Sequence, residues 1–253
     1  MKKLLPLMLV LIALAGLIMG YKERALATEK GETAICTTYD AYVKARDAFD
    51  RYALDESRTH EVVSVNISLV TAFDLRIFDY LLPLSYIGQS ISAMGHYDEG
   101  IETMMLRIGW ADDAELTNHD DGSLSLTGTS HDGSVLNLRI HYLPEQDQLR
   151  LEALQDETTV LLFEYAKNGD GYIAQYYFNE IAGHDWGSAI WKMCVYKTFF
   201  SGNNGSAARF DGVEEPETIL GTTFSEQDFI AGATHWFTLV DGKFSGNLNG
   251  KVF

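Results

Sequence analysis

The chain has 253 residues, of which 46% are hydrophobic and 12% aromatic, and its formal net charge is −17 at pH 7. This composition can form a sizeable buried core, which excludes an intrinsically disordered chain. The excess of carboxylates repels phosphate groups and anionic lipid headgroups. We therefore expect no nucleic-acid partner and no binding of the mature protein to an anionic membrane surface.

The first 27 residues have the pattern of an export signal. Lys2 and Lys3 precede an apolar run over residues 4–19, and this order of positive and apolar residues directs a chain into the translocation machinery. The run is shorter than the roughly 20 residues that span a membrane as a stable helix. Small residues at Ala25 and Ala27 then match the pattern that signal peptidase accepts, so we predict cleavage after Ala27.

The mature protein is accordingly expected to begin at Thr28 and to be exported, as a secreted, periplasmic or cell-surface protein. The alternative is that the N-terminal segment stays uncleaved and anchors the protein in the membrane. No linker rich in proline, serine or glycine divides residues 28–253. We therefore expect a single α+β domain there, with helices at about residues 33–82 and strands at about residues 101–249.

Two amphipathic helices are expected over residues 33–82, because apolar residues recur there at intervals of three and four. The first begins near Ile35, and the second runs from about Thr59 to Leu82, where Pro83 ends it. Residues 55–57 offer turn and N-cap side chains between them, so the two helices should form a hairpin. Their apolar stripe consists of Tyr39, Tyr42, Phe49, Val62, Val65, Leu69, Phe73 and Ile77.

From about residue 101 apolar residues alternate with polar ones, which predicts eight to ten antiparallel strands joined by short turns. A short helix is expected after an N-cap at Ser225. The expected strands include residues 136–142, 149–151, 161–165, 172–178, 188–200, 235–240 and 243–248. The glycine-containing turns include Asp121-Gly122, Asp132-Gly133, Asn168-Gly169-Asp170-Gly171 and Asp241-Gly242.

These elements define an α+β protein in which an N-terminal helical hairpin packs on a long, curved antiparallel β meander. A meander of that length curls or exposes its edges, so a half-barrel-like sheet covered by the hairpin is the expected architecture. This order of elements resembles that of bacterial periplasmic lipoprotein carriers, whose half-open barrel is covered by helices. The resemblance lies in the outline alone, since no sequence motif carries it.

The chain contains two cysteines, Cys36 in the first expected helix and Cys194 in an expected strand. In an oxidising compartment such a pair can form a disulfide, which here would join the helix to the sheet. The alternative is that both are buried free thiols that pack as small apolar side chains.

We find no motif of a nucleophile elbow, zinc helix, phosphate loop or dinucleotide site, and we expect no cofactor and no metal. Two weaker features remain. The Asn168-Gly169-Asp170-Gly171 sequence resembles the start of a calcium loop. Such a loop would need an oxygen ligand at Ala166 and a bidentate acid at Tyr177, and neither residue supplies one, so a tight hairpin is the favoured interpretation. The His184-Asp185-Trp186 sequence could place His184 as a general base in a polar site, but a turn anchored by a buried tryptophan is the favoured interpretation.

The surplus of aromatic side chains points to binding. Tyr176 stands beside Tyr177 and Trp236 beside Phe237, so aromatic residues fall on both faces of their strands. One set fills the core, and the other needs a cover from helices, a partner or a ligand. We therefore expect a non-enzymatic protein that binds an apolar small molecule or a protein partner. The alternative is an extracellular hydrolase whose carboxylates and histidines meet only in the folded chain.

Overall fold

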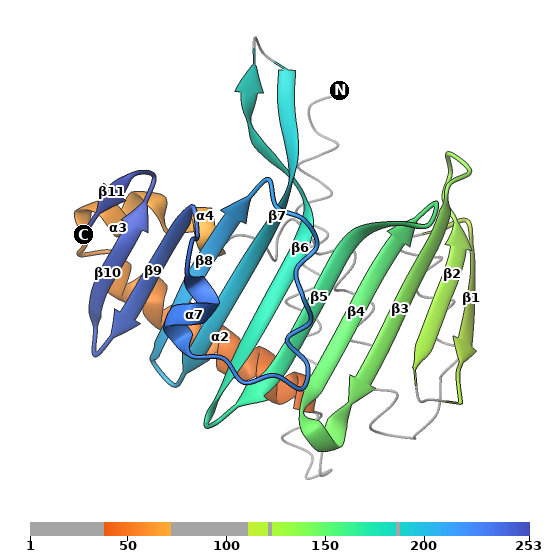
Figure 1. Ribbon diagram of the computed structural model, residues 1–253, viewed down its shortest axis with the longest axis horizontal. Coiled ribbons are helices and arrows are strands. Elements are labelled where there is room, and N and C mark those ends of the chain that lie inside the picture. Colours follow the sequence, from red (N-terminus) through yellow and green to blue (C-terminus); the bar gives the residue numbers. More distant parts are fainter. Residues whose placement is uncertain (1–37, 72–110, 121–122, 186–187) are drawn as a thin grey trace, which may run out of the picture. The chain divides into compact units, whose positions relative to one another are not determined.

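The computed structural model describes residues 38–71, 111–120, 123–185 and 188–253, and these belong to one compact unit, Thr37–Phe253. Most of this unit is one large antiparallel sheet of eleven strands, accompanied by a few helices (Figure 1). Each strand pairs with its neighbours in sequence, and among the described residues no pairing of β1 with β11 closes the sheet. The predicted antiparallel meander is thereby confirmed.

Four helices and eleven strands are described. The helices are α2 (Thr38–Ser57), α3 (Glu61–Asn66), α4 (Ser68–Thr71) and α7 (Glu226–Ile230), with one turn of 3₁₀ helix at Pro144–Gln146. The strands are β1 (Asp113–Asn118), β2 (Leu124–Thr129), β3 (Val135–Leu143), β4 (Gln148–Gln155), β5 (Thr158–Asn168), β6 (Gly171–Asp185), β7 (Ser188–Ser201), β8 (Asn204–Asp211), β9 (His235–Val240), β10 (Lys243–Leu248) and β11 (Lys251–Val252). The expected strands over 235–240 and 243–248 have the predicted bounds.

Tight turns set the register of these hairpins. Asp241 and Gly242, between β9 and β10, have φ angles of 50° and 75°, the left-handed pair that a two-residue type I′ turn requires. Gly169, between β5 and β6, has a φ of 58°, so the expected hairpin at this sequence is confirmed. The predicted N-cap of α7 is also confirmed, because the Ser225 side chain accepts a hydrogen bond from the backbone N–H of Asp228.

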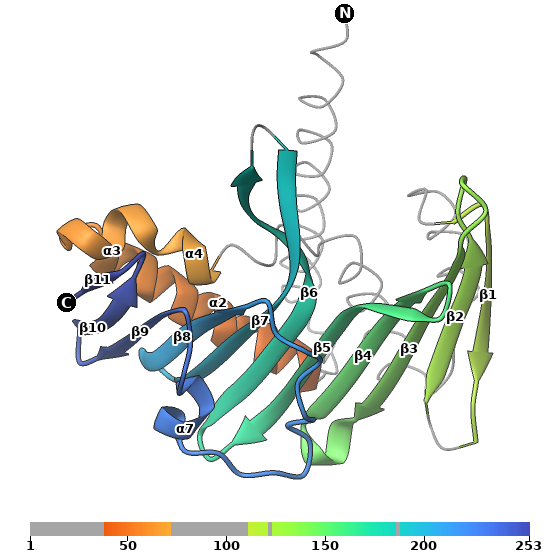
Figure 2. The same cartoon turned by 45° about the horizontal axis from the view of Figure 1, so that its top comes forward.

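One face of the sheet carries the aromatic core, and α2 packs on it (Figure 2). Tyr42 of α2 stacks on Tyr165 of β5 with ring centroids 4.3 Å apart, and its hydroxyl lies 2.8 Å from that of Tyr176. Two turns further along α2, Phe49 stacks on Phe200 of β7 at 5.6 Å. The predicted burial of the first helix's stripe is therefore confirmed for the part that lies in α2. We call this side of the sheet the α2 face.

The opposite face of the central strands is covered by residues 212–234, which we call the covering segment. Ile219 and Phe229 of this segment are buried against β5 and β6, and α7 lies on the other side of the sheet from α2 (Figure 1). Lys197 of β7 lies beneath it, with its Nζ 4.7 Å from the centre of the Phe229 ring. Burial lowers the pKa of Lys197. The second apolar face thus finds a cover within the chain itself.

The second predicted helix differs from the expectation. It is divided into α3 and α4, and its N-cap is His60 rather than a residue of the 55–57 turn. Val65, expected to face the core, is 71% exposed, whereas Val63, Ile67 and Val70 are buried. These three residues are themselves spaced by four and three, so the sequence contains two candidate stripes. Packing, which periodicity cannot weigh, buries these three residues, while Leu69 of the expected stripe is partly buried against the same core.

Parts of the sequence prediction concern residues outside those described. They are the export signal over residues 1–27, the cysteine at Cys36, and Phe73 and Ile77 in the remainder of the second helix. These stay predictions. Within the described ranges, no helix combines the length and the apolar character needed to cross a membrane.

We predict that α2 depends on Phe49 for its attachment to the sheet. Phe49→Ala should lower the free energy of unfolding by about 3–5 kcal/mol, because the ring is fully buried and its removal leaves a cavity. Leu54→Ala is the matched control, since Leu54 lies in the same helix and is 45% exposed; it should cost less than about 1 kcal/mol. Urea denaturation of both variants measures this. Equal losses would contradict the packing described here.

Candidate functional site

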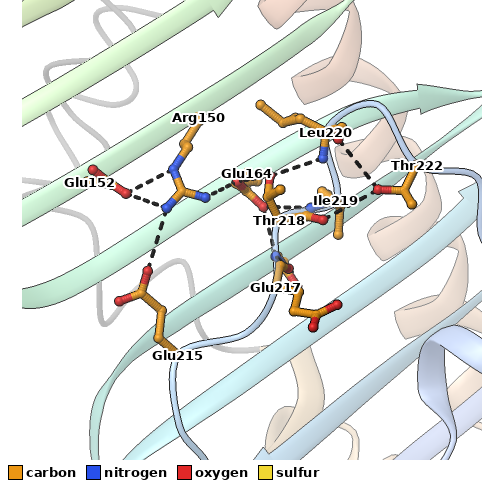
Figure 3. A network of polar contacts seen from close by, with 10 residues as sticks. Arg150, Glu152, Glu164, Glu215, Glu217, Thr218, Ile219, Leu220 and Thr222 are labelled. Carbon is orange, nitrogen blue, oxygen red and sulfur yellow. Dashed lines mark hydrogen bonds and ion pairs between the residues drawn. The ribbon is translucent and has the colours of Figure 1, made fainter.

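A buried carboxylate is the centre of a polar network on the face covered by residues 212–234 (Figure 3). Glu164 of β5 accepts hydrogen bonds from the Gln175 amide at 2.7 Å, the Thr218 hydroxyl at 2.7 Å and the Ile219 backbone N–H at 3.0 Å. It also forms an ion pair with Arg150 of β4. Because four donors converge on one buried carboxylate, Glu164 ties the covering segment to the sheet.

Arg150 in this network is shared among three carboxylates. Besides Glu164, it contacts Glu152 on its own strand and Glu215 of the covering segment at 3.5 Å. The Arg150 guanidinium is therefore neutralised by the protein, and it is engaged in holding the segment rather than available to an external anion. We interpret this network as structural.

A second cluster of charged side chains lies on the α2 face, at the end of the aromatic core. Arg209 of β8 is 6% exposed and contacts Asp211 at 2.6 Å and Glu180 at 3.4 Å. The hydroxyl of the fully buried Tyr196 donates to Glu180, and the Arg209 guanidinium lies 5.6 Å from the centre of the Tyr196 ring. Removing such charges from water is compensated by their mutual contacts.

Cys194 lies in this second cluster but lacks the properties of a nucleophile. Its thiol is 3.3 Å from Asp211. Burial, together with the hydrogen bond to that carboxylate, raises the pKa of Cys194 to about 11. A nucleophilic cysteine needs a lowered pKa, which favours the thiolate.

His235 borders the same cluster. It lies 3.8 Å from Asp211, beyond hydrogen-bonding distance, and burial lowers the pKa of His235. The cluster is chemically varied, but its thiol is held protonated.

Strands β6 and β7 extend beyond their neighbours as a two-stranded arm, residues 181–185 and 188–192 (Figures 1 and 2). Pairing of β5 with β6 ends at Phe178, and pairing of β7 with β8 begins at Cys194. Within the described residues, the arm therefore pairs only with itself. It carries Ile190, which is 40% exposed, and Trp191, which is 58% exposed.

A shallow depression of about 530 Å³ lies on β1–β3, on the side of the sheet opposite the α2 face. Seven of its eight described lining residues are polar or charged, and the Nε2 atom of His119 lies 2.7 Å from the Ser125 hydroxyl. The lining residues are Thr117, His119, Ser123, Leu124, Ser125, Thr127, Asn137 and Arg139.

The residues singled out from the sequence have different outcomes. Cys194 is buried and forms no disulfide within the described residues. Because Cys36 lies outside them, the Cys36–Cys194 disulfide stays a prediction. The His184-Asp185 pair lies on the arm at the end of β6, and Trp186 is outside the described residues. The interpretation of this sequence as a buried turn anchor therefore stays a prediction as well.

Sequence reasoning missed both charged networks, although one signal was present. Glu164 interrupts the apolar run over residues 160–166, and a single carboxylate inside the apolar run of a central strand must find buried partners. The partners themselves could not be named, because Thr218 and Ile219 are more than fifty residues away in the chain.

Comparisons of the chain with models of protein families, with curated proteins and with solved structures found no match.

We predict that Glu164 holds the covering segment in place. Glu164→Gln should lower the free energy of unfolding by about 2–3 kcal/mol, because it weakens charge-assisted hydrogen bonds inside the sheet. It should also speed cleavage after Glu217 by a glutamate-specific protease. Glu145→Gln, an exposed change in the 3₁₀ turn, is the control. Unchanged cleavage and stability in Glu164→Gln would contradict the role assigned to this carboxylate.

We further predict that Cys194 is unreactive in the folded protein. In a Cys36→Ser variant, alkylation by iodoacetamide at pH 8 should be negligible, because the raised pKa of about 11 leaves almost no thiolate. The same sample unfolded in urea should react at the ordinary rate of a free thiol. Rapid alkylation of the folded variant at pH 8 would show that Cys194 is accessible and activated.

Proposed function

We propose that the chain is an exported, non-enzymatic binding protein that docks a protein partner on the arm, residues 181–185 and 188–192. The observation that carries this proposal is the exposed Trp191 on a hairpin that projects past the rest of the sheet. Large exposed aromatic residues are costly to leave in water and are frequent centres of protein interfaces.

The surroundings of Trp191 favour a docking role. Other large apolar side chains exposed in the described residues stand singly, as Leu54, Val135 and Val240 do, whereas Ile190 and Trp191 are consecutive in β7 and so expose one apolar side chain on each face of the arm. The arm also offers backbone groups on a two-stranded ribbon, and a partner can add a strand to such an edge. Apolar anchors and an available strand edge together suit a peptide or protein.

A protein partner is favoured over an apolar small molecule by the packing of the α2 face. Rings such as Tyr42, Tyr165 and Phe163 are at most 1% exposed and lie in mutual contact. These aromatic residues are already used to attach α2 to the sheet. The same packing supports the finer architecture that we propose, a helical hairpin lying across a curved, half-barrel-like sheet.

The export of this protein is proposed from its N-terminal sequence. Lys2 and Lys3 followed by the apolar run over residues 4–19 support translocation, and cleavage after Ala27 would release the mature chain. A partner would then be met outside the cytoplasm.

Site-specific photo-crosslinking in the source cells tests the proposal. A benzophenone amino acid at position 191 should give a defined crosslinked product with another protein, whereas the same probe at position 135 should not. Val135 is the matched control because it is an apolar strand residue that is 56% exposed, close to the 58% of Trp191. No product at 191, or the same products at both positions, would contradict docking on the arm.

A further inference from the structure

We propose a second, separate binding site: the depression on β1–β3 takes a small hydroxylated oxyanion, a sugar acid or a sugar phosphate, with Arg139 as its anion contact. This inference does not depend on the arm, because the depression lies on different strands.

The charge of the lining sets this depression apart from the rest of the chain. The chain has 36 acidic and 19 basic residues, yet the described residues of the lining include Arg139 and His119 and no carboxylate. Among the described residues, no carboxylate forms an ion pair with Arg139. An unpaired guanidinium on a floor without acidic groups attracts an oxyanion and can bind it with two parallel hydrogen bonds.

The neighbouring network explains why Arg139 has no carboxylate partner among the described residues. Glu152 stands directly opposite Arg139 in the β3–β4 register, the position from which cross-strand ion pairs form. Its carboxylate is instead bound by Arg150 on its own strand. Glu115, on the same face as Thr127, flanks the depression without lining it. The Arg150 network therefore binds the carboxylate that stands opposite Arg139 and leaves the Arg139 cation available.

The other lining groups suit hydroxyls. Thr117 pairs with Ser125, Ser125 with Arg139, and Thr127 with Asn137 in the strand registers, so their side chains share one face. Hydroxyl groups both donate and accept hydrogen bonds. The side-chain oxygen of Asn137 has no hydrogen-bond partner in the described structure, which leaves an unmet acceptor in the lining. A volume of about 530 Å³ falls within the range of small-molecule sites.

Calorimetric titration of the purified protein with three compounds tests the inference. Glucuronate and glucose 6-phosphate represent the two sources of the oxyanion, and glucose is the neutral control. At least one anionic compound should bind about tenfold or more tightly than glucose, because a charge-assisted contact is lost in glucose. The anion that binds identifies the source.

Two variants make the result specific. Arg139→Gln should weaken binding of that anion by about tenfold or more, with an unchanged thermal unfolding midpoint, because the side chain is exposed. Arg51→Gln, an exposed change on α2, should leave the affinity unchanged. Failure of both anions to bind, equal binding of glucose, or full binding by folded Arg139→Gln would overturn the inference. None of these outcomes bears on crosslinking at position 191.

Discussion

Strands β5 to β8 bury apolar side chains on both of their faces, so each face needs a cover from elsewhere in the chain. On the α2 face, Tyr42 and Phe49 supply the contacts that hold the helix against the rings of the sheet. On the opposite face, the cover has little regular structure, and the buried Glu164 carboxylate fixes it through the backbone of Ile219. The central sheet is therefore a two-sided core, and the rest of the structure depends on both covers being in place.

This constraint determines which surfaces can bind something else. The middle strands are committed to internal packing, and their charged groups are committed to one another. What remains available lies outside the doubly covered region. The arm projects beyond it with Trp191 exposed, and the depression on β1–β3 lies beside it with Arg139, which has no ion pair among the described residues. The Arg150 network links the covered core to the depression. It anchors the covering segment, and it also forms an ion pair with Glu152, the carboxylate opposite Arg139.

Local sequence was sufficient for the strands and turns. Alternation predicted β9 and β10 with their bounds, and Asp241-Gly242 predicted the turn between them, because these features depend on neighbouring residues alone. The face of the second helix was only partly predictable, since two stripes with the same spacing compete: Leu69 of the expected stripe packs against the core, whereas Val65 is exposed. The networks were not predictable either. Glu164 signalled a buried charge, but its partners come from a segment whose position only the folded sheet defines.

Amide hydrogen exchange over the whole chain tests the two-sided core most directly. If β5–β8 are stabilised from both faces, their amides should exchange slowest and at a rate set by global unfolding, together with those of α2 around Tyr42. Amides of β1, β2 and the arm at residues 181–185 and 188–192 should exchange faster, through local opening. Protection of β1 and β2 equal to that of β5–β8, or free exchange of α2 while β6 stays protected, would contradict the account.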